Sequence, residues 1–173
     1  MKTLALIFSL IFVTAVAKAP ETVYTFKLKT LDNADFSLAK YKGKKILVVN
    51  TASRCGYTPQ YTDLQKLQDL YQDKLVIVGF PANNFANQEP GSAADIKKCI
   101  AEKGAHFLLS EKVSVKGDDI SPLFKYLTTA PNPDFTGEIK WNFEKFLIDE
   151  NGNLIHRFRS AVVPTTEAIT KYL

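Results

Sequence analysis

Apolar residues along the chain fall into two kinds of pattern, continuous runs and helical repeats. Residues 46–49 and 75–80 are continuous apolar runs, which are typical of strands covered on both faces. Between them, apolar residues recur at helical spacing over 61–71. Thr58 and Pro59 precede this repeat, where we expect a helix N-cap followed by proline at the first helical position. Strand, helix and strand in this order predict a right-handed βαβ unit with parallel strands.

Weaker patterns predict the remaining elements. Residues 24–28 alternate weakly as a strand does, and the turn signal Asn151-Gly152 between two apolar runs predicts a β-hairpin. The hairpin strands are residues 145–148 and 154–158. Further helices are expected over 94–102 and 123–127, with a closing helix from Thr165. Residues 81–91 and 132–137 are expected to be loops. This order predicts an α/β chain with a thioredoxin-like fold, in which helices flank a central mixed β-sheet and one extra segment is inserted.

The composition fits a single globular domain. The chain has 173 residues, of which 46% are hydrophobic and 23% charged, enough for one core and too short for two domains of ordinary size. The formal net charge is +4, and the lysines are spread along the chain instead of forming a basic block. We therefore expect no binding to nucleic acid or to membrane surfaces.

The N-terminus has the pattern of a secretory signal. Lys2 precedes an apolar stretch, and Ala15-Val16-Ala17 supplies the small residues of a cleavage site. The alternative is an uncleaved anchor, but the apolar stretch is shorter than the roughly 20 residues that a membrane span needs. We expect residues 1–17 to be a signal peptide and 18–173 to form the mature domain, exported to the periplasm or secreted, without stable membrane insertion.

The stretch NTASRCGYTP places Cys55 directly after the first buried run and ahead of a helix. Open α/β folds place their sites at the carboxyl ends of parallel strands, and a helix N-terminus favours a thiolate there. Polar neighbours, including Arg54, favour a reactive cysteine over a buried structural cysteine or one half of a disulfide. Thr58 stands where a disulfide reductase has its second cysteine, so the motif differs from that of a disulfide reductase.

The sequence gives little support for a metal site. Copper delivery by this fold needs a second soft ligand near the first cysteine, but the residue after Thr58 is proline. Besides the two cysteines, only His106 and His156 are available as nitrogen ligands. We expect no metal and no cofactor, and ordinary positions at the surface or at a sheet edge for both histidines.

Three uncharged side chains with N–H donors follow or precede predicted strands. Gln88 lies in the loop after the second buried run, and Trp141 and Asn142 stand just before the hairpin. If these donors converge on Cys55, they stabilise a thiolate and then hydrogen-bond the oxygen that leaves a peroxide. The alternatives are a core aromatic for Trp141 and loop capping for the two amides.

Three blocks of the sequence resemble the signature blocks of the glutathione peroxidase family. They are VNTASRCGYT, GFPANNFANQEPG and IKWNFEKFLIDENG, in the family's order, and the resemblance extends from about Tyr24 to the C-terminus. It implies a thioredoxin-like fold and a catalytic tetrad of Cys55, Gln88, Trp141 and Asn142. The implied activity is reduction of hydrogen peroxide and organic hydroperoxides through a cysteine sulfenic acid, which protects against oxidative stress.

The sequence departs from the family at several positions. Ala82 and Asn84 stand where members often have cysteine and glutamine, and we expect altered packing without loss of activity. Cys99 lies one or two positions before the usual resolving cysteine and shares a helical face with Ile96 and Ile100. It is either a resolving cysteine, which requires local unwinding of the helix, or an inert core residue.

The resemblance also bears on partners and assembly. The short stretch between Leu127 and Trp141 resembles that of monomeric members, which implies a monomer with an open site. No arginine cluster for glutathione is apparent, so we expect a thioredoxin-like protein as reductant in preference to glutathione. Two other functions stay open: a binding or electron-transfer module, and a peroxide sensor that passes its oxidation to a partner.

Overall fold

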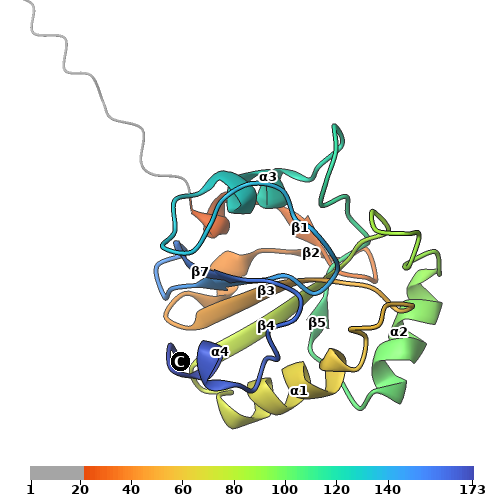
Figure 1. The fold of residues 1–173 in the computed structure, drawn as a ribbon, viewed down its shortest axis with the longest axis horizontal. Helices are drawn as coiled ribbons and strands as arrows, with labels where there is room; N and C mark the ends of the chain where they lie inside the picture. The colour runs from red at the N-terminus through yellow and green to blue at the C-terminus, as the bar shows by residue number, and fades with distance from the viewer. Residues whose placement is uncertain (1–21) are drawn as a thin grey trace, which may run out of the picture.

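A five-stranded sheet forms the centre of the molecule in a computed structural model that describes residues 22–173 (Figure 1). The predicted signal peptide, residues 1–17, lies outside the described residues. The strand order is β5-β4-β3-β6-β7. The strands are β3 (Lys45–Thr51), β4 (Leu75–Pro81), β5 (Leu108–Leu109), β6 (Lys145–Ile148) and β7 (Leu154–Phe158).

The sheet is mixed, as the pattern predicts. β3 pairs in parallel with β4, and β4 in parallel with β5. β6 runs antiparallel to β3, and β7 antiparallel to β6. The predicted βαβ unit and the predicted hairpin are therefore both present, and together they supply the four longer strands of the sheet.

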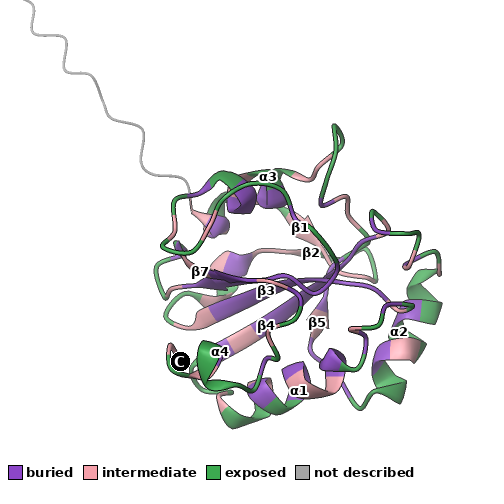
Figure 2. Cartoon of the chain, viewed as in Figure 1, coloured by how far each residue is buried: buried purple, intermediate pink, exposed green. Residues whose placement is uncertain are grey.

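Helices cover both faces of this sheet. On one face, α1 (Gln60–Leu70), α2 (Ala93–Glu102) and α4 (Glu167–Thr170) pack into a core cluster with alternate residues of β3, Leu47 and Val49. On the other face, α3 (Pro122–Thr129) packs with Ile46 and Val48. β3 is buried on both sides, from its second residue to its last (Figure 2). The chain thus has the single-domain, thioredoxin-like architecture that its sequence predicts.

The N-terminal part of the described chain differs from the prediction. The strand expected over 24–28 is replaced by a 3₁₀ turn, η1 (Val23–Thr25), and a short hairpin of β1 (Leu28–Lys29) and β2 (Asp35–Phe36). A second 3₁₀ turn, η2 (Leu38–Tyr41), follows. The strand prediction is wrong because Val23 inserts into the core and its N–H bonds the carbonyl of Gly152 at 3.0 Å.

Two helix ends also differ. α1 begins at Gln60, with Pro59 at its N-cap and no side-chain cap, so the expected capping role of Thr58 is wrong. The closing helix, expected from Thr165, has only four residues. Thr58 makes other hydrogen bonds, which shape the turn that carries Cys55.

Candidate active site

Cys55 lies in a turn between the end of β3 and the start of α1. The residue is 7% exposed and belongs to the core cluster beneath α1 and α2. The expectation that its polar neighbours keep it out of the core is wrong, although Arg54 itself is exposed. The turn folds the cysteine inward while its charged neighbour stays in water, so the sulfur sits at the edge of an apolar environment.

Thr58 holds this turn closed. Its hydroxyl accepts a hydrogen bond from the Cys55 N–H at 3.0 Å and donates to the Ala52 carbonyl at 2.9 Å. Its own N–H bonds the Cys55 carbonyl at 3.0 Å. Local side-chain bonds of this kind compete with helix capping, which explains why α1 starts without a side-chain cap.

A backbone amide reaches the sulfur. The N–H of Tyr57 lies 3.4 Å from Cys55 Sγ, a geometry that stabilises negative charge on the sulfur. In the described part of the chain, none of the three side-chain donors predicted from sequence makes a hydrogen bond to Sγ. Their convergence on the sulfur stays a prediction, but the structure brings their segments together.

Gln88 lies beside the cysteine turn. Its carbonyl accepts a hydrogen bond from the Arg54 N–H at 3.0 Å, which joins the loop after β4 to the residue before Cys55. Ala86 and Asn87 have positive φ angles of 49° and 50°, a backbone conformation that costs energy outside glycine. The strain indicates that the loop is held in a specific shape by its surroundings.

Asn142 reaches the same loop from the other side. Its side chain is fully buried, and its Nδ2 donates to Gln88 Oε1 at 3.0 Å. Trp141 is 38% exposed, with its ring centroid 5.7 Å from that of Phe85. Trp141 is therefore not a core aromatic, and Asn142 bonds a second predicted site residue instead of capping its own loop.

Asn50 fixes the Trp141–Asn142 segment, and the sequence prediction missed it. Its Nδ2 donates to the Trp141 carbonyl at 3.2 Å, and its Oδ1 accepts from the Glu144 N–H at 2.9 Å. Its own carbonyl accepts from the Phe143 N–H at 2.6 Å. Phe143 has a φ of +66°, so this anchoring maintains a strained backbone. An amide at the end of a buried apolar run was the available signal.

Cys99 faces the cysteine turn from α2. Its side chain packs against the core cluster that contains Cys55, and its Sγ lies 3.9 Å from the Ser53 carbonyl. Both cysteines are free, with Cys55 buried and Cys99 partly buried. The position is compatible with either alternative, a resolving thiol or a small residue at the edge of the core.

Glu89 is a buried carboxylate beside the same turn. Burial raises its pKa, while Ser53, Lys112 and Arg54 act in the opposite direction. Ser53 faces the carboxylate, but neither oxygen of Glu89 has a hydrogen-bond partner of good geometry. The negative charge of Glu89 is thus disfavoured next to the turn that carries Cys55.

Four residues remain from the sequence analysis, namely Ala82, Asn84 and the two histidines. Asn84 is exposed and bonds Ser114 Oγ at 2.9 Å and the Val115 N–H at 2.9 Å, whereas Ala82 is fully buried. Of these two departures from the family, only Ala82 therefore lies at a packing position. His106 is exposed, and His156 lies 3.1 Å from Asp134.

Residues 22–173 contain no group of three or more potential metal ligands. No helix in this range is long and apolar enough to cross a membrane.

The chain is similar to known proteins over most of its length. Residues 23–128 match the model of the glutathione peroxidase family. The glutathione peroxidase homolog BsaA of Staphylococcus epidermidis is 48% identical over 140 residues, which cover 80% of this chain and 89% of that protein.

A relative from Synechocystis and a solved structure extend this similarity. The hydroperoxy fatty acid reductase gpx1 of Synechocystis is 43% identical over 156 residues, which cover 86% of this chain and 92% of that protein. The crystal structure of Trgpx in its apo form superposes with a TM-score of 0.70 at 34% identity, covering 88% of this chain and 95% of that one.

Proposed function

The chain belongs to the glutathione peroxidase family, and from this premise we propose that it is a thiol-dependent peroxidase acting through Cys55. The substrates proposed are hydrogen peroxide and organic hydroperoxides, and the biological role is protection against oxidative stress. The observation that carries the proposal is the position of Cys55. Its sulfur accepts a hydrogen bond from the Tyr57 N–H, and its turn is bonded to the Gln88 loop through the Arg54 N–H.

The first chemical step consumes the peroxide. The Cys55 thiolate attacks one peroxide oxygen, so that an S–O bond forms and the O–O bond breaks. The sulfur is oxidised to a sulfenic acid, and the peroxide is reduced to water or an alcohol once the departing oxygen takes up a proton. The Tyr57 N–H supports the proposal because a hydrogen bond stabilises the thiolate and leaves the sulfur free to attack the peroxide.

Gln88, Trp141 and Asn142 are proposed as donors to the reacting oxygen. The bond between Asn142 Nδ2 and Gln88 Oε1 uses the acceptor end of Gln88, so the donor end of its amide faces away from Asn142. Such donors act when they are in place before the reaction, because they then need no reorganisation as charge develops on the leaving oxygen.

The surface beside the turn favours apolar substrates as well as hydrogen peroxide. Trp141 is partly exposed against Phe85, and this pair offers an aromatic contact to the organic part of a hydroperoxide. The relative from Synechocystis, named a hydroperoxy fatty acid reductase, supports the same substrate class for this chain.

A thiol then reduces the sulfenic acid. We propose that Cys99 performs this step, because its sulfur lies 3.9 Å from the Ser53 carbonyl, two residues before Cys55. The Cys99 sulfur bonds the Cys55 sulfur and water leaves, which requires α2 or the turn to move. A thioredoxin-like dithiol, in preference to glutathione, then reduces the disulfide.

The proposed setting is an exported monomer. The N-terminal pattern supports cleavage after about Ala17, and N-terminal sequencing of the exported protein tests it. The short segment between α3 and Trp141 supports the monomeric state, which light scattering tests.

Trapping of the sulfenic acid and a comparison of reductants test the proposed function. After one equivalent of peroxide, a dimedone adduct should appear on Cys55 and be absent in Cys55→Ser. Steady-state peroxide consumption should be faster with thioredoxin and its reductase than with glutathione and its reductase. Absence of the adduct in a Cys99→Ser background, where the sulfenic acid persists, contradicts the proposal. Adduct formation without turnover with either reductant would instead favour a peroxide sensor.

A further inference from the structure

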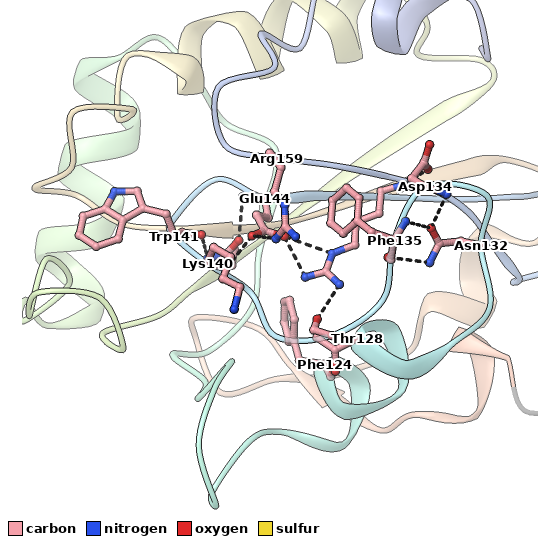
Figure 3. Close-up of polar contacts among 12 residues, drawn as sticks. Phe124, Thr128, Asn132, Asp134, Phe135, Lys140, Trp141, Glu144 and Arg159 are labelled. Carbon is pink, nitrogen blue, oxygen red and sulfur yellow. Dashed lines mark hydrogen bonds and ion pairs between the residues drawn. The ribbon is translucent and has the colours of Figure 1, made fainter.

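Glu144 is a fully buried carboxylate with four hydrogen-bond donors around it. Oε1 accepts from the Lys140 N–H at 2.6 Å and from Arg159 Nη1 at 2.7 Å. Oε2 accepts from Arg157 Nε at 3.1 Å and Nη2 at 2.9 Å. We call Glu144, Arg157 and Arg159 the Glu144 cluster. Figure 3 labels Glu144 and Arg159 of this cluster, together with Lys140 and Trp141. No part of the proposed chemistry uses these charges.

The cluster is bonded directly to the segment that carries Trp141 and Asn142. Lys140 is the residue before Trp141, and its N–H is held by the Glu144 side chain. At the other end, the Glu144 N–H and carbonyl pair with Asn50. The three residues between these anchors include Phe143 with its positive φ. Glu144 thus fixes both ends of a strained segment, through its side chain at one end and its backbone at the other.

The two arginines extend this support to the chain leading into the segment. Arg157 Nη1 donates to the Gly137 carbonyl at 2.7 Å, and its guanidinium lies 4.8 Å from the ring centroid of Phe135. The guanidinium of Arg159 lies 3.8 Å from the same ring. Contacts of this kind orient an aromatic side chain as well as the cation. Residues 135–140 are therefore held by the same charges that hold Glu144.

Trp141 itself points away from the cluster. Figure 3 shows the indole directed away from Glu144 and Arg159, while its backbone stays next to Lys140. A buried ion pair that served stability alone requires no bond to the residue before a site tryptophan. Because of the bond to Lys140 and the Asn50 contacts, the positions of Trp141 and Asn142 depend on how the Glu144 carboxylate is hydrogen-bonded.

We propose that Glu144, supported by Arg157 and Arg159, is a positioning residue for the peroxide reaction, setting where Trp141 and Asn142 lie beside Cys55. The proposal rests on the proposed function, because it assigns importance to those two side chains. It predicts that loosening the cluster slows oxidation of Cys55 even when the fold is intact.

Arg159 offers the cleanest test, because its side chain is 41% exposed while Arg157 is fully buried. Arg159→Gln removes one partner of Oε1 and leaves both bonds from Arg157 to Oε2. We expect the second-order rate constant for oxidation of Cys55 by hydrogen peroxide to fall about tenfold, since small displacements of positioned groups slow reactions by such factors. Arg159→Lys, which keeps the charge, should give an intermediate rate.

Trp141 provides a second readout that loss of stability alone does not change. It is the only tryptophan of the chain, so its quenching by acrylamide in the folded protein reports the position of this segment. Quenching should increase in Arg159→Gln and less in Arg159→Lys, at unchanged circular dichroism. The matched control is Glu150→Gln, which removes the exposed ion pair of Glu150 with Lys45 in the same sheet and should change neither readout.

The outcomes separate this inference from the proposed function. If the wild-type protein does not react with peroxide, the proposed function fails. If the wild type reacts and folded Arg159→Gln and Glu144→Gln react at the same rate as wild type, the positioning role alone is wrong. Should Glu144→Gln fail to fold, Arg159→Gln decides the matter, because its partner Glu144 keeps Arg157.

Discussion

Asn142 Nδ2 lies 3.0 Å from Gln88 Oε1, so a single hydrogen bond joins two residues that are 54 positions apart in the sequence. One comes from the loop after β4 and the other from the segment before β6. The two strands next to these segments, β4 and β6, lie on either side of β3, the strand that leads to Cys55. The bond therefore makes Gln88 and Asn142 one unit, placed across the end of the central strand.

Asn142→Asp should impair the reaction by breaking this unit. The new carboxylate has the size of the amide but loses the donor and faces the Gln88 oxygen in a fully buried position. Removal of one oriented donor to a developing oxyanion typically costs about 10²-fold or more in rate. Stopped-flow oxidation by hydrogen peroxide measures the effect.

Asn151→Asp is the matched control for the added charge. Asn151 is exposed in the hairpin turn between β6 and β7, and the same substitution there should leave the rate at the wild-type value. Equal rates for Asn142→Asp and Asn151→Asp, with both proteins folded, would show that the Asn142–Gln88 bond has no part in the chemistry.

Cys99→Ser separates the two alternatives for Cys99. The serine is close in size and keeps a donor near the Ser53 carbonyl, so we expect a folded protein. The first oxidation of Cys55 should be unchanged, but turnover with thioredoxin should fall at least tenfold, because no disulfide with Cys55 can form. Mass spectrometry of the oxidised wild type should find that disulfide. Unchanged turnover in Cys99→Ser would assign Cys99 to the core.

Lys145 should make stability depend on pH. Burial lowers its pKa from 10.5 to about 7, while Glu144 and Asp63 act in the opposite direction. Its Nζ donates to the carbonyls of Ser160 at 3.0 Å and Val162 at 2.6 Å.

Between pH 7 and 10.5 the unfolded chain binds more protons at this lysine than the folded one, so its contribution to stability increases as pH rises. From pH 7.5 to 9 the gain is about 2 kcal/mol.

Lys145→Met removes this titration. In urea unfolding at several pH values, the free energy of unfolding of the wild type should rise relative to that of Lys145→Met as pH increases across this range. Lys45→Met, which removes a lysine from β3 in the same sheet, serves as the control and should follow the wild type. Parallel curves for wild type and Lys145→Met would contradict the lowered pKa.

Gly152→Ala should destabilise the protein where the hairpin turn packs against Tyr24. Gly152 has a φ of +91°, and a Cβ there would lie 2.7 Å from Cδ2 and Cε2 of the Tyr24 ring. We expect a loss of about 2–4 kcal/mol in the free energy of unfolding, from backbone strain plus displacement of the ring.

Gly43→Ala tests the strain alone. Gly43 has a φ of +86° and nothing within 4 Å of the position of a Cβ, so its substitution should cost about 1 kcal/mol. Urea unfolding of both variants measures the difference, which is the contribution of the contact with Tyr24. Equal losses would mean that the Tyr24 ring moves aside without cost.

The sequence predicts those parts of the fold whose signal is local. β3, α1 and β4 follow from apolar runs and a helical repeat over 46–80, and the β6–β7 hairpin from two runs around Asn151-Gly152. β5 has only two residues and pairs with β4 at Val78 and Gly79. So short a strand forms because β4 is already in place to pair with it. The two residues of β5 therefore contain no pattern that predicts a strand.

The site illustrates the same limit. Cys55, Gln88, Trp141 and Asn142 can be proposed as site residues from the sequence, because each lies in a recognisable block. Asn50 and Glu144 cannot, because their contacts are bonds between segments that only the folded chain brings together. The sequence predicts the wrong role for Thr58, because its hydroxyl can either cap a helix or close a turn. The hydrogen bonds with Ala52 and Cys55 show that it closes the turn.

The most direct test of the account is stopped-flow tryptophan fluorescence of the reduced protein, without its predicted signal, mixed with hydrogen peroxide and with an organic hydroperoxide. Trp141 is the only fluorescent indole, and it precedes the asparagine that is bonded to Gln88. The account predicts a fast change whose rate rises linearly with peroxide concentration and which Cys55→Ser abolishes. A reaction no faster than that of a free thiol, or one that survives in Cys55→Ser, would contradict the assignment of Cys55 as the peroxide-reactive residue.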